Sequence, residues 1–347
     1  MSPAARVYLG IFLAPLIPFL DREDVTDLYV NKPGELWLET GDGTERHIVP
    51  SLDEASLWRL ARQIAATSDQ GISREHPLLA ATLPDGSRIQ ICAPPATRSA
   101  IAVAIRKHNV PDLRLSDYFQ AGAFSRVGEA AISENAVNRS LTALLNAGNI
   151  MEFLAAAVRA RKTIVVGGGT GTGKTTFLNA LLKEAPTDER LILIEDTPEI
   201  QLSHENAVGL IAVRGRLGEA EVSPADLVEA ALRLKPDRII MGEIRGAEAM
   251  SWLRAVGTGH PGSVTTVHAN SASGISEQLA LMALMSGVEL RRSELIDYIR
   301  DIVDIFIQVG RHEGARLITE IEFSTNSQTS LEIVPTKIGT TAMRAMI

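Results

Sequence analysis

The sequence predicts an α/β fold built on a parallel sheet, preceded by a smaller α+β domain. In the second half of the chain, helical patterns alternate with four apolar runs: TIVVGGG at 163–169, RLILIEDT at 190–197, DRIIMGE at 237–243 and SVTTVHA at 263–269. Apolar strands alternating with helices are typical of a parallel sheet covered on both faces. The first half instead shows short runs of alternating apolar and polar residues, which favour antiparallel strands. With 347 residues, the chain has room for two domains.

The first predicted element is an apolar run at 8–20 (YLGIFLAPLIPFL), which follows Arg6 and is broken by Pro15 and Pro18. It is about half as long as the ~20 residues that a membrane-spanning helix needs. We interpret it as an amphipathic helix and turn packed on the first domain. Peripheral association with a membrane surface is the alternative interpretation.

The remainder of the first domain reads as strands and one helix. Residues 25–48 form short strands broken by turns at 33–34 and 41–43, and a helix over 52–67 begins after Ser51, a good N-cap with Glu54 three residues on. Two strands flank the turn at 84–86, and another strand covers 101–106. We expect this α+β domain to span residues 1–118.

Three further segments follow. Residues 119–149 are rich in Gly, Ala, Ser and Asn, which predicts a long linker with room for one helix. Residues 150–323 carry the alternating strands and helices of the second domain. Residues 324–347 are polar and aperiodic, which predicts a flexible tail.

Composition narrows the classes of function. The formal net charge is −8, whereas proteins that grip phosphate backbones usually present a clustered basic surface. Direct nucleic-acid binding is therefore disfavoured. Cys92 is the single cysteine and lies in the strand-like run RIQICAP, so it cannot form an internal disulfide and reads as a small buried apolar residue. The cytoplasm is the compartment that fits best.

The strongest motif is GGTGTGKT at 168–175, which fits G-x-x-x-x-G-K-[ST] and lies between an apolar strand and an amphipathic helix. Glycines let the chain curl around a phosphate, and the new helix adds its positive N-terminal end. We expect Lys174 to reach the β- and γ-phosphates of ATP and the Thr175 hydroxyl to ligate Mg²⁺. The predicted nucleotide-binding residues of this loop are Gly168, Gly169, Thr170, Gly171, Thr172, Gly173, Lys174, Thr175 and Thr176.

A phosphate-binding loop of this kind needs carboxylates at the same edge of the sheet. Glu243 ends an apolar strand, so we predict that it positions or activates water. The metal-associated Asp expected one place earlier is replaced by Gly242, which makes Glu195 and Asp196 the candidates for holding the water shell of the metal. The alternative for each is a solvated carboxylate at a strand end.

Two histidines, His260 and His268, lie in and after a glycine-rich loop downstream of Glu243. A single histidine is usually structural, but a pair in this position could sense the γ-phosphate. We favour His268. No cluster of thiolates and no His-x-x-x-His spacing predicts a metal beyond the nucleotide-bound Mg²⁺.

Several boxes in this order resemble the secretion ATPase superfamily, and specifically the hexameric ATPases of bacterial type IV secretion and conjugation systems. The resemblance covers residues 7–323 and rests on VTDLYVNKPGELWLE, LPDGSRIQI, AIRK, GGTGTGKTTFLNALL, IEDTPEI, ALRLKPDRIIMGEIRGAEA and GTGHPGSVTTVHANS. It implies a RecA-like ATPase domain, in which Gly-Glu at 242–243 is the normal second acidic box. It also implies a homo-hexamer on the cytoplasmic face of the inner membrane, working with inner-membrane components of the secretion channel.

The same resemblance implies arginines that close over the phosphates. Arg106 in AIRK matches such an arginine and Arg98 matches it less well, while Arg245 and Arg233 match arginines that could act across subunits. An arginine from another domain or subunit stabilises the transition-state charge. The alternative is that these are ordinary solvated surface arginines.

Two rival functions use the same loop. A hexameric helicase shares the RecA-like sheet, but the acidic charge and the absence of a basic aromatic stripe count against it. A slowly hydrolysing binding switch is the other rival. No Asn-Lys-x-Asp motif follows the loop, which argues against a guanine-specific GTPase.

Overall fold

The computed structural model describes residues 3–98, 100–108, 113–126, 129–202, 204–213, 219–324 and 332–333. By their contacts the residues group into two compact units, described separately below. Unit 1 comprises Met1–His108, Pro186–Pro261 and Met285–Gly287, and unit 2 comprises Asn109–Ala185, Gly262–Leu284 and Val288–Ile347. This grouping does not define independently folding domains, so the boundaries at 118, 149 and 323 stay predictions. Nearly all of the predicted tail lies outside the described residues.

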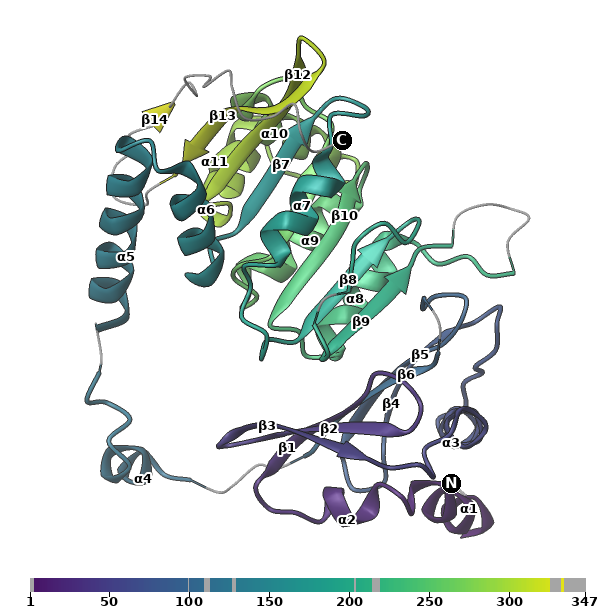
Figure 1. The fold of residues 1–347 in the computed structure, drawn as a ribbon. Coiled ribbons are helices and arrows are strands. Elements are labelled where there is room, and N and C mark those ends of the chain that lie inside the picture. Colours follow the sequence, from purple (N-terminus) through teal and green to yellow (C-terminus); the bar gives the residue numbers. More distant parts are fainter. Residues whose placement is uncertain are drawn as a thin grey trace. The chain divides into compact units, whose positions relative to one another are not determined.

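The N-terminal part of unit 1 is a six-stranded antiparallel sheet in the order β3-β2-β1-β6-β5-β4 (Figure 1). The strands are β1 (Val25–Val30), β2 (Glu35–Thr40), β3 (Gly43–Ile48), β4 (Leu78–Thr82), β5 (Arg88–Cys92) and β6 (Ala102–Arg106). Helix α3 (Glu54–Thr67) buries Leu57, Leu60 and Ile64 in the apolar core below this sheet. The predicted α+β arrangement of strands and helix is therefore present.

The start of α3 corrects one prediction. Asp53, not Ser51, is the N-cap, because its carboxylate accepts the Ser56 backbone N–H at 2.7 Å. A side-chain acceptor at the N-cap satisfies an amide that the helix leaves unpaired. Leu52, predicted inside the helix, is instead buried just before it.

The N-terminal apolar run forms two helices, α1 (Pro3–Leu13) and α2 (Ile17–Leu20), joined by a turn, where one helix and a turn were predicted. Leu9 and Leu16 are buried in the core, and α1 packs against α3. Tyr8 and Ile11 are exposed. Over the residues that the structure describes, no helix has the length and apolar character needed to cross a membrane.

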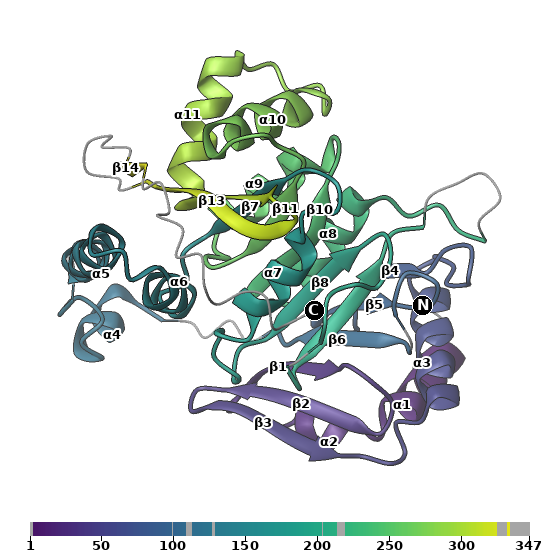
Figure 2. The ribbon, with the colours of Figure 1, turned by 45° about the horizontal axis from the view of Figure 1, so that its top comes forward.

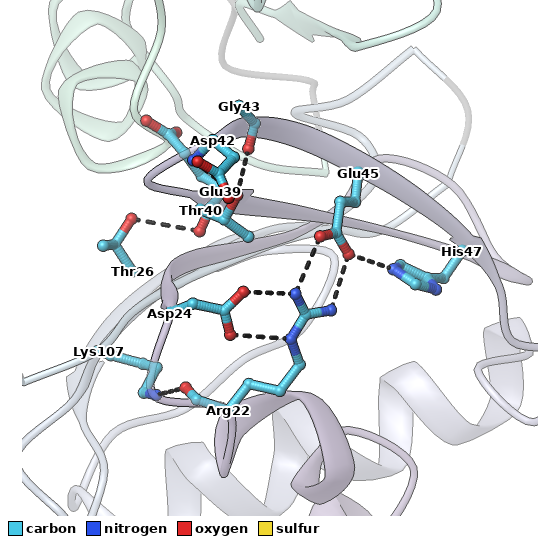
Figure 3. Close-up of polar contacts among 10 residues, drawn as sticks. All are labelled: Arg22, Asp24, Thr26, Glu39, Thr40, Asp42, Gly43, Glu45, His47 and Lys107. Atoms are coloured by element: carbon cyan, nitrogen blue, oxygen red, sulfur yellow. Dashed lines mark hydrogen bonds and ion pairs between the residues drawn. The ribbon is translucent and has the colours of Figure 1, made fainter.

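Arg22 ties α2 to the sheet (Figure 3). Its guanidinium donates to Asp24 Oδ2 at 2.6 Å and to Glu45 Oε2 at 2.7 Å, and the Arg22 carbonyl accepts from Lys107 Nζ. Glu45 also contacts His47 Nε2 at 2.9 Å. One arginine thus joins the end of α2 to β1, β3 and the end of β6.

The second part of unit 1 contains three parallel strands, β8 (Leu191–Glu195), β9 (Ala207–Ile211) and β10 (Arg238–Ile244), with helices α8 (Pro224–Arg233) and α9 (Glu248–Gly257). Strands β8 and β10 were predicted, whereas β9 was not. The short segment 96–98 lies antiparallel to β9, with a bridge between Thr97 and Leu210. A paired strand edge is protected from association with other chains.

Unit 2 holds β7 (Ile164–Gly168), β11 (Val264–Val267), β12 (Ile305–His312), β13 (Ala315–Phe323) and β14 (Glu332–Ile333). Strands β11 and β12 run parallel to β7, and β13 returns antiparallel to β12. Its helices are α4 (Leu115–Gln120), α5 (Glu129–Asn146), α6 (Ile150–Arg159), α7 (Lys174–Leu182), α10 (Ala272–Leu284) and α11 (Arg292–Ile302). Figure 2 shows α10 and α11 together on one side of β7 and β12, with α6 and α7 on the other.

The segment assigned to the linker contains α5, the one helix that was expected there. Helix α4, which straddles the predicted boundary at 118, and helices α10 and α11 were not predicted. The strands after β11 were also missed, although β12 is an apolar run that is buried from Ile305 to Val309. Every residue of β7 is buried, as expected for a strand covered on both faces.

Candidate nucleotide-binding site

The glycine-rich loop connects β7 to α7 in unit 2, as the motif predicted. Gly171 has φ 73° and Gly173 has φ 96°, a left-handed conformation that glycine adopts without steric cost. A Cβ atom on Gly168 would lie 2.6 Å from Thr172 Oγ1 and 2.7 Å from the Val309 carbonyl oxygen. The loop therefore requires glycine both for its turns and for its close packing on β12.

Lys174 begins α7 and is 8% exposed. Its ammonium donates to the carbonyl oxygens of Gly168 at 3.0 Å and Gly169 at 3.2 Å, so the side chain folds back over the loop. The Thr172 hydroxyl donates to the Gly169 carbonyl at 2.9 Å. Thr175 is half-buried in the first turn of α7, next to exposed Thr176. The cation is thus held where the loop amides and the helix N-terminus favour an anion.

Arg316 is a neighbour of the loop that the sequence did not single out. It lies in β13, and a Cβ atom on Gly173 would approach Arg316 Cδ to 3.0 Å. In the strand pair it stands opposite Arg311. No motif marks this position, and only the return of β13 along β12 brings it beside the loop.

His268 follows β11 and lines a pocket of about 390 Å³ in unit 2 together with Gly169 of the loop. Asn270, Ser271 and Glu277 are among the other lining residues. His260 belongs to unit 1, and its Nδ1 lies 2.8 Å from the Ala255 carbonyl oxygen near the end of α9. Within unit 2, His268 therefore lies beside the glycine-rich loop, and within unit 1, His260 contacts the end of α9.

Glu195 ends β8 in unit 1 and is buried. Its Oε1 accepts the backbone N–H groups of Glu199 at 2.8 Å and Ile200 at 2.7 Å, and its Oε2 accepts a hydrogen bond from Arg98. A Cβ atom on Gly242 would lie 3.2 Å from Glu195 Cγ. Glycine at 242 thus leaves room for the Glu195 side chain, which gives a physical reason for the missing Asp.

Glu243 lies one residue before the end of β10, with 15% of its side chain exposed. Arg245 bridges Glu243 and Asp196, and the longer of the two contacts is 3.4 Å from Arg245 Nη1 to Asp196 Oδ2. The hydrogen bond that the Arg245 guanidinium donates to Glu243 raises the pKa of that guanidinium. Glu195, Asp196, Glu243 and Arg245 therefore meet at one edge of unit 1, as predicted for strand ends of a parallel sheet.

Arg106 lies elsewhere in unit 1, in a pocket of about 270 Å³ whose lining also includes Arg88, Arg233 and Lys235. Arg106 donates to Asp27 at 3.1 Å. Arg88 stands directly opposite Arg106 in the β5–β6 pair, and like charges in such a pair are destabilising. Arg88 lies in the motif LPDGSRIQI but was not predicted as a site residue, because only the strand register places it beside Arg106.

The other predicted residues have plain structural partners. Arg233 forms a 2.8 Å ion pair with Glu229 one turn earlier in α8, the solvated helix-surface pairing that was its alternative. Cys92 is fully buried, which raises the pKa of its thiol to about 12. Within the described ranges, no group of three His, Cys, Asp or Glu side chains is arranged to hold a metal ion.

Comparison with known proteins shows the family to which the chain belongs. Residues 12–304 match the family model described as "Type II/IV secretion system protein". The type IV secretion system protein VirB11 of Brucella suis is 40% identical over 334 residues, which is 94% of this chain and 92% of the relative. PtlH of Bordetella pertussis is 36% identical over 320 residues, covering 90% of this chain and 93% of its own.

Among solved structures, the VirB11 ATPase of the Brucella suis type IV secretion system in complex with sulphate has a TM-score of 0.83 at 38% identity. That alignment covers 91% of this chain and 97% of the other. The glycine-rich loop and the apolar parallel strands define a P-loop ATPase of the RecA-like α/β class. Within that class, the chain belongs to the Type II/IV secretion system protein family.

Proposed function

We propose that the protein is the ATP-hydrolysing motor of a bacterial type IV secretion system, energising its assembly or the transport of substrate. The observation that carries the proposal is the strand–loop–helix geometry of β7, the glycine-rich loop and α7. The likeness to VirB11 over 94% of the chain supports the cellular role. Both relatives described above are named as type IV secretion system proteins.

The loop fits a bound triphosphate with Mg²⁺. Lys174 already caps two loop carbonyls and needs only a rotation of its side chain to contact the β- and γ-phosphates. Thr175 presents its hydroxyl from the first turn of α7, where a metal ligand is required. Mg²⁺ would neutralise charge on the phosphates. The charged ammonium and the aligned amides bind the phosphate oxygens.

We call Glu195, Asp196 and Glu243 the acidic edge, and we assign to it the handling of water and of the metal. Glu243 would orient the attacking water, and Asp196 and Glu195 would hold the water shell of the metal. Arg245 pairs with Glu243 and Asp196 in this structure, so its release from Glu243 is part of the proposed cycle. His268 is assigned to sensing the γ-phosphate, because it shares a pocket with the loop glycine Gly169.

We assign the arginines of the first domain to neutralising the negative charge of the phosphates. Arg106 and Arg88 stand side by side on β6 and β5, and an anion between them would relieve the repulsion of their charges. Arg98 and Arg245 were assigned to the same task from the sequence. In the structure, however, the Arg98 side chain pairs with Glu195.

The assembly is proposed to be a homo-hexamer on the cytoplasmic face of the inner membrane, contacting inner-membrane components of the secretion channel. The exposed side chains of Tyr8 and Ile11 on α1 support peripheral contact with a membrane surface. The net charge of −8 argues against direct nucleic-acid binding.

ATP turnover by the purified protein tests the proposal. Lys174→Ala is expected to lower turnover at least about 100-fold, because the loop loses the ammonium group that would contact the phosphates. Glu243→Gln is expected to bind ATP but to lower kcat by a similar factor. Lys183→Ala, on the exposed C-cap of the same helix, is the matched control and should stay at the wild-type rate. Unchanged turnover in Lys174→Ala would refute the proposed function.

A further inference from the structure

The contact between Arg98 and Glu195 joins two stretches of unit 1 that are far apart in the sequence. The Arg98 guanidinium donates through Nη2 to Glu195 Oε2, and the two side chains are 14% and 2% exposed. An ion pair so far removed from water is screened much less than a surface pair. Removing one partner of such a pair leaves a buried charge uncompensated.

The second carboxylate oxygen of Glu195 also accepts hydrogen bonds. Oε1 accepts the N–H groups of Glu199 and Ile200, so the carboxylate holds the turn that begins at Asp196. A carboxylate with three donors from two directions is fixed in orientation. Arg98 therefore contributes to the shape of the turn that carries Asp196, and it does so without reaching beyond Glu195.

Two glycines make room for the pair. A Cβ atom on Gly209 would lie 2.4 Å from Arg98 Cδ and 2.6 Å from Arg98 Nε, and one on Gly242 would lie 3.2 Å from Glu195 Cγ. Neither glycine has a left-handed backbone. The physical reason for glycine at these two positions is thus the space that the side chains of Arg98 and Glu195 occupy.

Strand pairing sets the position of Arg98. Its backbone N–H donates to the Gly209 carbonyl at 3.0 Å, and the Ile211 N–H donates to the Ala96 carbonyl at 2.9 Å. Segment 96–98 is therefore held on β9 in one register, which aims the Arg98 side chain across Gly209 at the end of β8. The guanidinium reaches Glu195 only while this segment is paired with β9.

We propose that Arg98 is a positioning residue that acts through Glu195, and that ATP turnover depends on the docking of segment 96–98 onto β9. This inference rests on the proposed function. It replaces the role of phosphate contact that the sequence suggested for Arg98. Because Gly242 has no side chain, Glu195 packs against β10 immediately before Glu243. A change in the position of Glu195 should therefore displace the acidic edge. The glycine-rich loop belongs to unit 2 and should keep its structure.

The first test separates catalysis from nucleotide binding. Arg98→Ala is expected to lower kcat about 10- to 100-fold, the cost of displacing catalytic groups by roughly 1 Å, while the Kd for ADP changes less than about twofold. Arg74→Ala is the matched control, because Arg74 also pairs with a residue of the second part of unit 1, Glu219, but at the surface. A raised Kd with kcat retained at saturating ATP would show that Arg98 binds phosphate and would overturn the inference.

Gly209→Ala provides a test that removes no charge. Its added methyl group should displace Arg98, so kcat should fall in the same direction as in Arg98→Ala, with the melting temperature checked for both. Millimolar guanidinium should partly restore kcat to Arg98→Ala but not to Gly209→Ala, where the side chain is still present. A wild-type rate in Gly209→Ala would contradict the inference.

A double variant completes the design. The losses in Arg98→Ala and Glu195→Gln should not add in the combined variant, because both act through one interaction; additive losses would overturn the inference. If the wild type hydrolyses ATP and Arg98→Ala matches Arg74→Ala, this inference alone fails. If the wild type does not hydrolyse ATP, the proposed function fails and the inference with it.

Discussion

At the scale of single residues, the acidic edge shows how one residue type can serve different purposes. Glu195 is enclosed by Arg98 and two backbone amides, whereas Glu243 pairs with Arg245, an exposed side chain. Both carboxylates follow apolar strands in the sequence and look alike there. The two carboxylates therefore differ in burial and in the partners that hold them, although their sequence patterns are alike.

Cys92 gives a prediction at the same scale. Burial raises the pKa of its thiol to about 12, so almost no reactive thiolate is present near neutral pH. We expect no alkylation of the native protein by iodoacetamide at pH 8 and rapid alkylation after unfolding in urea, measured by mass spectrometry. Rapid labelling of the native protein would mean that strand β5 opens far more readily than its burial indicates.

At the scale of elements, the sequence predicted those whose pattern is local. The α3 helix, the turn between β4 and β5, and the loop between β7 and α7 all have capping, turn or glycine signals in their own residues. Strand β9 was missed because AVGLI is a short apolar run with a glycine in its interior, which weakens the pattern of a strand. It is a strand because β8 lies on one side of it and segment 96–98 on the other.

The Arg22 cluster gives a prediction for the junction of α2, β1 and β3. Hydrogen bonds from Arg22 and then His47 lower the pKa of the Glu45 carboxyl to about 2, and Arg22 also lowers the pKa of Asp24. Because these pKa values are depressed on folding, the stabilisation is present above the unfolded value near 4.5 and is lost as the pH falls from there towards 2.

Arg22→Ala should therefore unfold at lower urea concentration than the wild type at pH 6, with the difference shrinking as the pH falls below 4.5. Urea unfolding followed by circular dichroism at several pH values measures this. Arg59→Ala removes an exposed arginine of α3 that donates a hydrogen bond to Ser56, and it is the control for the loss of one charge. A difference that stays constant with pH would contradict the assignment.

At the scale of the whole molecule, family membership gives the fold and the class of activity, while the assembly is a prediction. We expect light scattering to give a mass close to six times the 37.4 kDa of one chain in the presence of ATP and Mg²⁺.

Addition of DNA should not stimulate ATP turnover, since the net charge of the protein is −8. A monomer with negligible turnover would favour a slow binding switch, and turnover stimulated by DNA with a steep salt dependence would favour a helicase.

The sequence by itself determined the fold class, the glycine-rich loop with Lys174 and Thr175, the acidic strand ends and the family. These features are encoded in contiguous residues, because a loop that wraps a phosphate and a strand that ends in a carboxylate are local structures. The tertiary structure alone decided which distant side chains meet: Arg98 with Glu195 across Gly209, Arg88 beside Arg106, and Arg316 beside Gly173. Such contacts depend on strand register and on the space left by glycines, and neither can be read from the spacing of residues along the chain.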